Sequence, residues 1–231
     1  MLGWNRLMMA DLPILYSFRR CPFAMRARMA LLVSGQRCLV REILLRDKPD
    51  AMIAASPKAT VPVLVLPDGA VIDQSVDIMR WTLGNHDPEG WLEDETGDRE
   101  ALIAQNDGPF KHHLDRYKYA NRHDCDPIEH RDAGMMILAG LDQRLAGRRN
   151  MFGDERAFAD IALFPFVRQF AATDQQWFDA QAAPNLQAWL SRHLGSTLFG
   201  AAMIKLQQWQ PDDEDLILPD YEGETVALSS A

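Results

Sequence analysis

The chain has few cysteines, no excess of positive charge and no long apolar run. Its 231 residues include three cysteines, at positions 21, 38 and 125. An odd and widely scattered set is not a disulfide framework, and no signal peptide is evident, so we expect a reducing, cytoplasmic location. The formal net charge is −9, which argues against a nucleic-acid partner. No apolar stretch is long enough to cross a bilayer, so we expect no membrane partner either.

The pattern of apolar residues divides the chain into two parts. Residues 12–84 alternate strand-like and helix-like segments in the order β-α-β-α-β-β-α, which predicts a small α/β domain. An acidic linker follows at 85–97. The periodicity at 98–210 is only helical, and we expect the acidic tail at 211–231 to lie along the surface. The expected strands are 13–18, 38–45, 61–66 and 70–72, and the expected helices are 22–34, 48–55, 74–83, 98–107, 109–120, 127–146, 157–172, 184–194 and 196–208.

Cys21 lies where the first strand gives way to the first helix, in the segment Ser-Phe-Arg-Arg-Cys-Pro-Phe-Ala. Pro22 suits the first helical position, because its missing N–H costs nothing there. Backbone N–H groups and the helix dipole then face the sulfur, and Arg19, Arg20 and Arg26 are close in sequence. Such surroundings lower a cysteine pKa and favour a reactive thiolate. The alternative is a buried structural cysteine.

Two further segments suggest a ligand site. Pro62 opens an apolar strand, where it cannot donate a hydrogen bond. A cis peptide before it would leave the backbone of Val61 able to pair with an extended ligand. Asp73, Gln74 and Ser75 open a helix, where side-chain oxygens and backbone N–H groups suit a carboxylate. A trans proline at a strand edge and a plain N-cap are the simpler alternatives.

Together these segments resemble the glutathione transferase superfamily, most closely its omega class and more loosely the two-domain glutaredoxins. The resemblance is carried by four stretches: Arg20 to Ala24 with Arg26 and Arg28, Asp47-Lys48-Pro49, Val61 to Leu64, and Gln74-Ser75. The stretch from Ala159 to Pro165 also looks like the start of that superfamily's buried helix. The resemblance implies a thioredoxin-like domain, an all-helical domain and a homodimer with two-fold symmetry.

The resemblance also implies a glutathione site, with glutathione as cosubstrate. Cys21 would be the catalytic thiol, and Lys48 would hold the glycyl carboxylate. Val61, in front of a cis Pro62, would bond the cysteinyl backbone. Gln74 and Ser75 would hold the γ-glutamyl end.

Two positions depart from the family pattern. Gln74 stands where an acidic residue is usual, so contact with the γ-glutamyl ammonium would lose its charge assistance. Ala157 stands where the buried helix usually has Ser or Thr three residues before Asp160, which removes the reciprocal capping bond.

Position 24 separates two mechanisms. A dithiol oxidoreductase has a second cysteine three residues after the first, whereas here that residue is Ala24. We expect Cys38 to be buried in the second strand. A monothiol cycle fits best: Cys21 attacks a small-molecule or protein mixed disulfide, becomes glutathionylated, and is released by free glutathione. One alternative is conjugation of hydrophobic electrophiles, with Tyr16 or Ser17 stabilising the glutathione thiolate. Another is a non-catalytic binding protein.

The segment between residues 111 and 130 is rich in histidine and basic side chains. Its histidine spacing matches no standard zinc pattern, so the sequence predicts no metal site, and a metal ion held by this segment is the alternative. The basic residues either attract anionic substrates or form a solvated helix face with tyrosines packed inward. The residues concerned are Lys111, His112, His113, Arg116, Tyr117, Lys118, Tyr119, Arg122, His123, Cys125 and His130.

Overall fold

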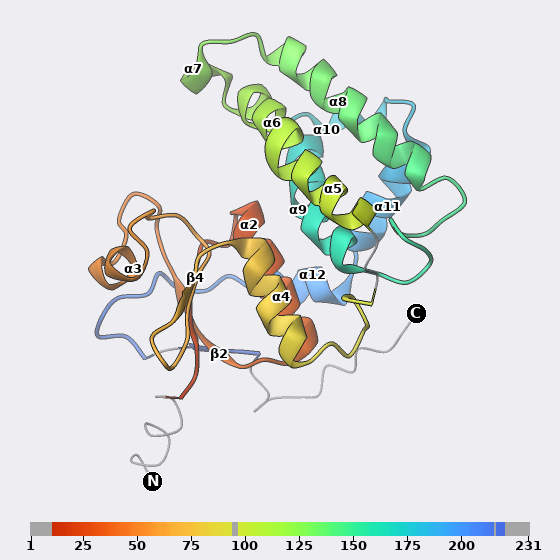
Figure 1. Ribbon diagram of the computed structural model, residues 1–231. Coiled ribbons are helices and arrows are strands. Elements are labelled where there is room, and N and C mark those ends of the chain that lie inside the picture. The colour runs from red at the N-terminus through yellow and green to blue at the C-terminus, as the bar shows by residue number, and fades with distance from the viewer. Residues whose placement is uncertain (1–10, 94–96, 215, 220–231) are drawn as a thin grey trace. The chain divides into compact units, whose positions relative to one another are not determined.

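The computed structural model describes residues 11–93, 97–214 and 216–219. The chain divides into two compact units (Figure 1). The first contains the chain up to Pro88 together with the chain from Thr197 onward, and the second contains Glu89–Ser196. The predicted helical domain, 98–210, therefore includes a terminal segment that the structure groups with the α/β unit. In the described parts of the chain, no helix has both the length and the apolar character needed to cross a membrane.

The first unit has the predicted order of elements, β-α-β-α-β-β-α, and the predicted α/β class. It is a thioredoxin-like unit built around a mixed sheet. Its elements are β1 (Ile14–Ser17), α2 (Pro22–Ser34), β2 (Cys38–Glu42), α3 (Asp50–Ala55), β3 (Val63–Val65), β4 (Val71–Ile72), α4 (Ser75–Asn85), α12 (Thr197–Ala202) and β5 (Leu216–Leu218).

The sheet of the described residues has five strands in the order β4-β3-β1-β2-β5. Strand β1 is parallel to β2, whereas the other neighbours are antiparallel. Successive residues of β1 point to opposite faces. Leu15 packs with Leu31 of α2 and Ile78 of α4, whereas Tyr16 packs with Met52 of α3. The sheet is thus covered by α2 and α4 on one face and by α3 on the other.

Strand β5 differs from the expected surface tail. Its residues pair with β2 in the register Cys38↔Leu218 and Val40↔Leu216. Leu218 is 9% exposed and joins the core beside α2. An unpaired edge strand exposes a row of backbone donors and acceptors. The apolar residues of β5 cover this edge of β2, although acidic residues precede them in the sequence.

Helix α2 is buried more completely than its spacing predicts. Apolar residues at 23, 27, 30, 31 and 33 predict a helix with one buried face and its arginines outside that face. This prediction is wrong, because Arg26 and Arg28 are only 0% and 1% exposed. The Arg28 guanidinium lies 3.4 Å from Oε2 of Glu42 and donates to the carbonyl of Ile204 at 3.4 Å. Desolvation lowers the pKa of Arg28 and raises that of Glu42. These partners allow an arginine to lie in the interior without an uncompensated charge.

The second unit is helical, as predicted. A π-helical turn replaces the break expected at Gly108-Pro109, because Pro109 has no N–H to donate within a regular α-helix. Helix α10 was not expected from the sequence. The described elements are α5 (Gly97–Gln105), η1 (Asn106–Phe110), α6 (Lys111–Lys118), α7 (Ala120–His123), α8 (Pro127–Arg144), α9 (Phe158–Ala171), α10 (Gln175–Asp179) and α11 (Pro184–Leu194).

The start of α9 is held by the carboxylate of Asp160, which is 0% exposed. Oδ2 accepts a hydrogen bond from the backbone N–H of Ala157 at 3.0 Å. Oδ1 accepts from the backbone N–H of Met151 at 3.0 Å and from the indole N–H of Trp189 at 2.7 Å. Ala157 has no side-chain acceptor, so half of the capping box is present, in agreement with the predicted loss of the reciprocal bond.

Candidate functional site

Cys21 is the N-cap of α2 and is half-buried. The turn between β1 and α2 is closed by a 2.9 Å hydrogen bond from the N–H of Cys21 to the carbonyl of Phe18. The same turn is also bonded to β2, because a carboxylate oxygen of Glu42 accepts a 2.6 Å hydrogen bond from the backbone N–H of Arg19. Pro22 occupies the start of the helix, as predicted. The thiol therefore lies at a helix N-terminus, where backbone dipoles favour negative charge.

The other two cysteines have different surroundings. Cys38 is 0% exposed, which confirms the prediction that it is buried. Desolvation raises the pKa of its thiol to about 12. Cys125 is half-buried in the second unit, where its Sγ lies 3.8 Å from the carbonyl oxygen of Arg116. A buried and protonated thiol is a poor nucleophile, so Cys38 is suited to packing rather than to chemistry.

Val61 is the residue that the structure brings directly to Cys21. The Sγ of Cys21 lies 3.6 Å from the carbonyl oxygen of Val61. The peptide bond between Val61 and Pro62 is cis, as predicted. Val61 belongs to the apolar cluster that contains Tyr16 and Met52, and the side chain of Cys21 packs against this cluster.

Ser75 begins α4 and is 5% exposed. Its Oγ accepts a 3.3 Å hydrogen bond from Nη1 of the buried Arg26, whose guanidinium lies 5.5 Å from the centre of the Phe23 ring. Helix α2 thus supplies both the cysteine and an arginine that holds the start of α4. The sequence suggested Arg26 only as a positive charge near the thiol. Its contact with Ser75 is between residues 49 positions apart, and local patterns carry no signal for it.

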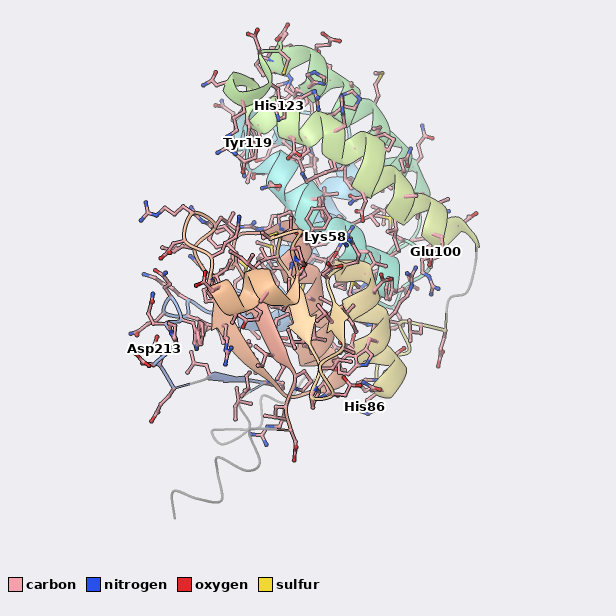
Figure 2. The ribbon with its side chains drawn as sticks, turned by 60° about the vertical axis from the view of Figure 1, so that its left-hand side comes forward. Lys58, His86, Glu100, Tyr119, His123 and Asp213 are labelled. Carbon is pink, nitrogen blue, oxygen red and sulfur yellow. The ribbon has the colours of Figure 1, made fainter. Side chains whose placement is uncertain are left out.

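Gln74 is the exposed N-cap of α4 and makes no side-chain capping bond. The preceding acidic residue, Asp73, is not free to replace the missing charge. Its carboxylate accepts 2.8 Å bonds from Nζ of Lys58 and Oγ of Ser56. These two hydrogen bonds lower the pKa of Asp73. Lys58 is labelled on the first unit in Figure 2.

Lys48 is half-buried on the segment between β2 and α3. This segment is ordered on both sides of the lysine. The backbone of Asp47 bridges to Leu44, and the carbonyl of Pro49 accepts the N–H of Met52 at 3.0 Å. Met52 in turn packs in the cluster that contains Val61. Lys48, Gln74 and Cys21 therefore lie on three different segments of the first unit.

The histidine and basic segment of the second unit lies on α6, α7 and α8. Tyr117 is 8% exposed and its ring packs against Phe170, which favours the interpretation of a solvated helix face with this tyrosine packed inward. The guanidinium of Arg122 lies 4.5 Å from the ring centre of Tyr119. Desolvation lowers the pKa of His112 and of His113, and the nearby Arg116 lowers both further.

Two family models match this chain. The glutathione S-transferase N-terminal domain matches residues 15–90, and the glutathione S-transferase C-terminal domain matches residues 100–192. Together they cover most of the chain, which therefore belongs to the glutathione S-transferase superfamily and has its fold.

Individual relatives match less of the chain or are more distant in sequence. Glutathione S-transferase omega-1 of Mus musculus and that of Rattus norvegicus are each 41% identical over 61 residues, which is 26% of this chain and 25% of each relative. The match thus spans about a quarter of these curated relatives.

Solved structures match over a longer range. A glutathione transferase family member from Pseudomonas fluorescens, with two glutathione bound, covers 84% of this chain and 93% of its own at a TM-score of 0.71 and 18% identity. Glutathione transferase F2 from Populus trichocarpa covers 83% and 97% at a TM-score of 0.68 and 16% identity. At such identities the similarity is one of fold.

Proposed function

We propose that the protein is a glutathione-dependent thioltransferase of omega type, with Cys21 as its nucleophile. The observation that carries the proposal is the place of this thiol, at the N-terminus of α2 and 3.6 Å from the Val61 carbonyl. A tyrosine- or serine-dependent transferase has no need of a cysteine in this position. The 41% identity to omega-1 enzymes over 61 residues supports the same class.

The reaction follows from the presence of a single thiol. The Cys21 thiolate attacks the glutathione sulfur of a mixed disulfide, and the substrate thiolate leaves and takes up a proton. Cys21 is then disulfide-bonded to glutathione. A second glutathione thiolate attacks the glutathione sulfur of this adduct, which regenerates Cys21 and yields oxidised glutathione. Ala24 offers no resolving thiol, and Cys38 is buried, so glutathione itself supplies the second step.

The two alternatives are less well supported. Conjugation would use Tyr16 or Ser17, which are 2% and 0% exposed. The hydroxyl of Tyr16 accepts a 3.0 Å hydrogen bond from Arg41 and thus already has a partner. A non-catalytic binding protein would also keep the fold. Retention on glutathione-agarose without turnover of a mixed disulfide would identify that alternative.

Exposure to oxidised glutathione provides the direct test. Cys21 should gain one glutathione adduct, which mass spectrometry of proteolytic fragments will locate. Cys38 should stay unmodified in the native protein, because its thiol is fully buried and its pKa is raised to about 12. An adduct found mainly on Cys125 would contradict the proposal.

The glutathione pocket is proposed to use Lys48 for the glycyl carboxylate, and Gln74 and Ser75 for the γ-glutamyl end. Lys48→Ala and Ser75→Ala should each raise the KM for glutathione by an amount equivalent to about 1–3 kcal/mol. Gln74→Glu should lower it, because a carboxylate there faces the γ-glutamyl ammonium. Steady-state kinetics will measure these changes. Arg46→Ala, an exposed cation two residues from Lys48, is the matched control, and unchanged kinetics in all three variants would remove the pocket.

We also propose a homodimer that acts in the cytoplasm. The superfamily generally dimerises with two-fold symmetry, and the monothiol cycle needs reduced glutathione and a reducing compartment. Light scattering at micromolar concentration should give about twice the chain mass of 26.2 kDa. A species of single-chain mass would contradict the dimer.

A further inference from the structure

Three histidines of the second unit meet between α6 and α8. His112 and His113 lie on α6, and His130 lies near the start of α8. One ring nitrogen from each residue can be chosen so that all three lie within 4.8 Å of one another. The closest pair consists of Nδ1 of His113 and Nδ1 of His130, 2.9 Å apart. The ring centres are separated by 5.1, 5.2 and 5.7 Å. We call these three residues the histidine cluster.

The backbone that carries the cluster is well fixed. Asp126 caps α8 by accepting a 2.8 Å bond from the N–H of Ile128, two residues before His130. Farther along α8, a Cβ at Gly134 would lie 2.7 Å from Phe170, so only glycine permits this close approach to α9. Figure 2 labels Tyr119, which directly follows α6, and His123, the last residue of α7. The three imidazoles are thus presented by packed helices rather than by a long loop.

We propose that the histidine cluster binds one divalent ion of the zinc, nickel or copper type. Imidazole nitrogen is a preferred ligand of these ions. A tetrahedral zinc ion with Zn–N distances of about 2.0–2.1 Å separates its ligand nitrogens by roughly 3.3 Å. The 2.9 Å between the closest two nitrogens of the cluster is slightly less than this distance, and the other nitrogen–nitrogen distances are within 4.8 Å. Side-chain rotations can therefore bring all three nitrogens to the ion.

The chemistry at the closest pair also favours an ion. Two nitrogens 2.9 Å apart share one proton, since one ring must donate and the other accept. When a cation binds between them, the donating ring carries its proton on Nε2 instead, so that both neutral rings present a lone pair on Nδ1 to the ion. Three protein ligands leave one tetrahedral position for water or a further ligand. The standard zinc spacings do not include this arrangement, because its ligands come from two helices and His113 and His130 are 17 positions apart in the sequence.

The positive charge of Arg116 opposes the binding of a cation to the histidine cluster. Its Nη1 lies 2.9 Å from Nδ1 of His112, where it donates to the ring and places a positive charge beside the cluster. The carboxylates of Asp115 and Glu129 act in the opposite direction on His112 and His113. Removal of the guanidinium should therefore strengthen metal binding, whereas a purely structural role for the histidines predicts no such gain.

Zinc titration of the full chain tests this site. Calorimetry on protein without a polyhistidine tag should give one Zn²⁺ per chain. His113→Ala and His130→Ala should each weaken binding by more than about tenfold, because loss of even the groups that support metal ligands typically costs 10–100-fold. Arg116→Gln should tighten it. His123→Ala, an exposed histidine outside the cluster, is the matched control and should bind as wild type does.

Further controls separate this site from the thiols and from unfolding. Cys21→Ser should keep the zinc stoichiometry, because the cluster contains no cysteine. Zn²⁺ should raise the unfolding temperature of wild type by mass action, but not that of folded His113→Ala. Wild-type zinc affinity in His113→Ala and His130→Ala would overturn the proposal, as would loss of binding in Cys21→Ser or an equal loss in His123→Ala. Zinc binding by the histidine cluster does not depend on whether the thioltransferase proposal is correct.

Discussion

Replacement of Cys21 by serine should reduce the turnover of glutathione mixed disulfides at least about a thousandfold, because removal of a catalytic nucleophile typically costs this much or more. A serine hydroxyl at neutral pH is a weak nucleophile and cannot form the disulfide intermediate. The substitution exchanges sulfur for oxygen at a half-buried N-cap, where serine is itself favoured. The fold should therefore be kept. A coupled assay of oxidised glutathione formation will measure the loss.

Cys125→Ser is the matched control for this prediction. It makes the same change of atoms at another half-buried cysteine, in the second unit, and should leave turnover unchanged. Circular dichroism of both variants should match that of wild type. If Cys21→Ser keeps turnover while Cys125→Ser loses it, the nucleophile has been assigned to the wrong cysteine.

The parts of the fold that the sequence could predict are those set by local patterns. The order of strands and helices in the first unit follows from apolar periodicity and from turn signals such as Pro67-Asp68-Gly69. Cys21 at the start of a helix follows from the proline after it. The cis bond before Pro62 is implied by the family resemblance and is present in the structure, whereas the position of this proline at the start of a strand left the trans form as the simpler alternative.

The features that escaped prediction depend on partners far away in the sequence. Burial of Arg28 requires Glu42 on β2 and the carbonyl of Ile204. Pairing of β5 with β2 joins residues about 180 positions apart, Cys38 and Leu218. Neither contact leaves a local pattern in the sequence. The position of Arg28 in the helical repeat is the same whether or not a distant partner buries its charge.

In the candidate site, too, local patterns predict the separate segments, whereas the contacts between the segments depend on residues far apart in the sequence. Its expected residues are spread over the α2 start, the segment before α3, the turn before β3 and the α4 start. Sequence motifs could suggest each segment separately. The link between them, from Arg26 to Ser75 and from Cys21 to Val61, comes only from the packing of α2 against α4 and β3. We therefore expect variants that loosen this packing to affect glutathione binding without touching the ligand.

Replacement of Asp160 by alanine should lower the free energy of unfolding by about 4 kcal/mol, because each of several buried N–H donors left without an acceptor costs about 1–3 kcal/mol. The donors are the N–H groups of Met151, Ala157 and Trp189, at 3.0, 3.0 and 2.7 Å. Urea unfolding will measure the change, and hydrogen exchange should place it in α9 and α11. Asp132→Ala, an exposed residue of the same unit, should change stability by less than about 1 kcal/mol. A similar small change in Asp160→Ala would contradict the predicted role.

The pH dependence gives an independent check on this carboxylate. Burial raises the pKa of Asp160 from 3.8 to about 6. Because the folded pKa exceeds the unfolded one, the proton-linked contribution of this group is complete below pH 4 and is lost as the pH rises through 6. The neighbouring His193, whose pKa burial lowers to about 3, stays neutral in the folded protein over most of this range. The stability of wild type relative to Asp160→Asn, which cannot titrate, should therefore fall between pH 4 and pH 6. A difference that stays constant over that range would show that the carboxylate is ionised throughout.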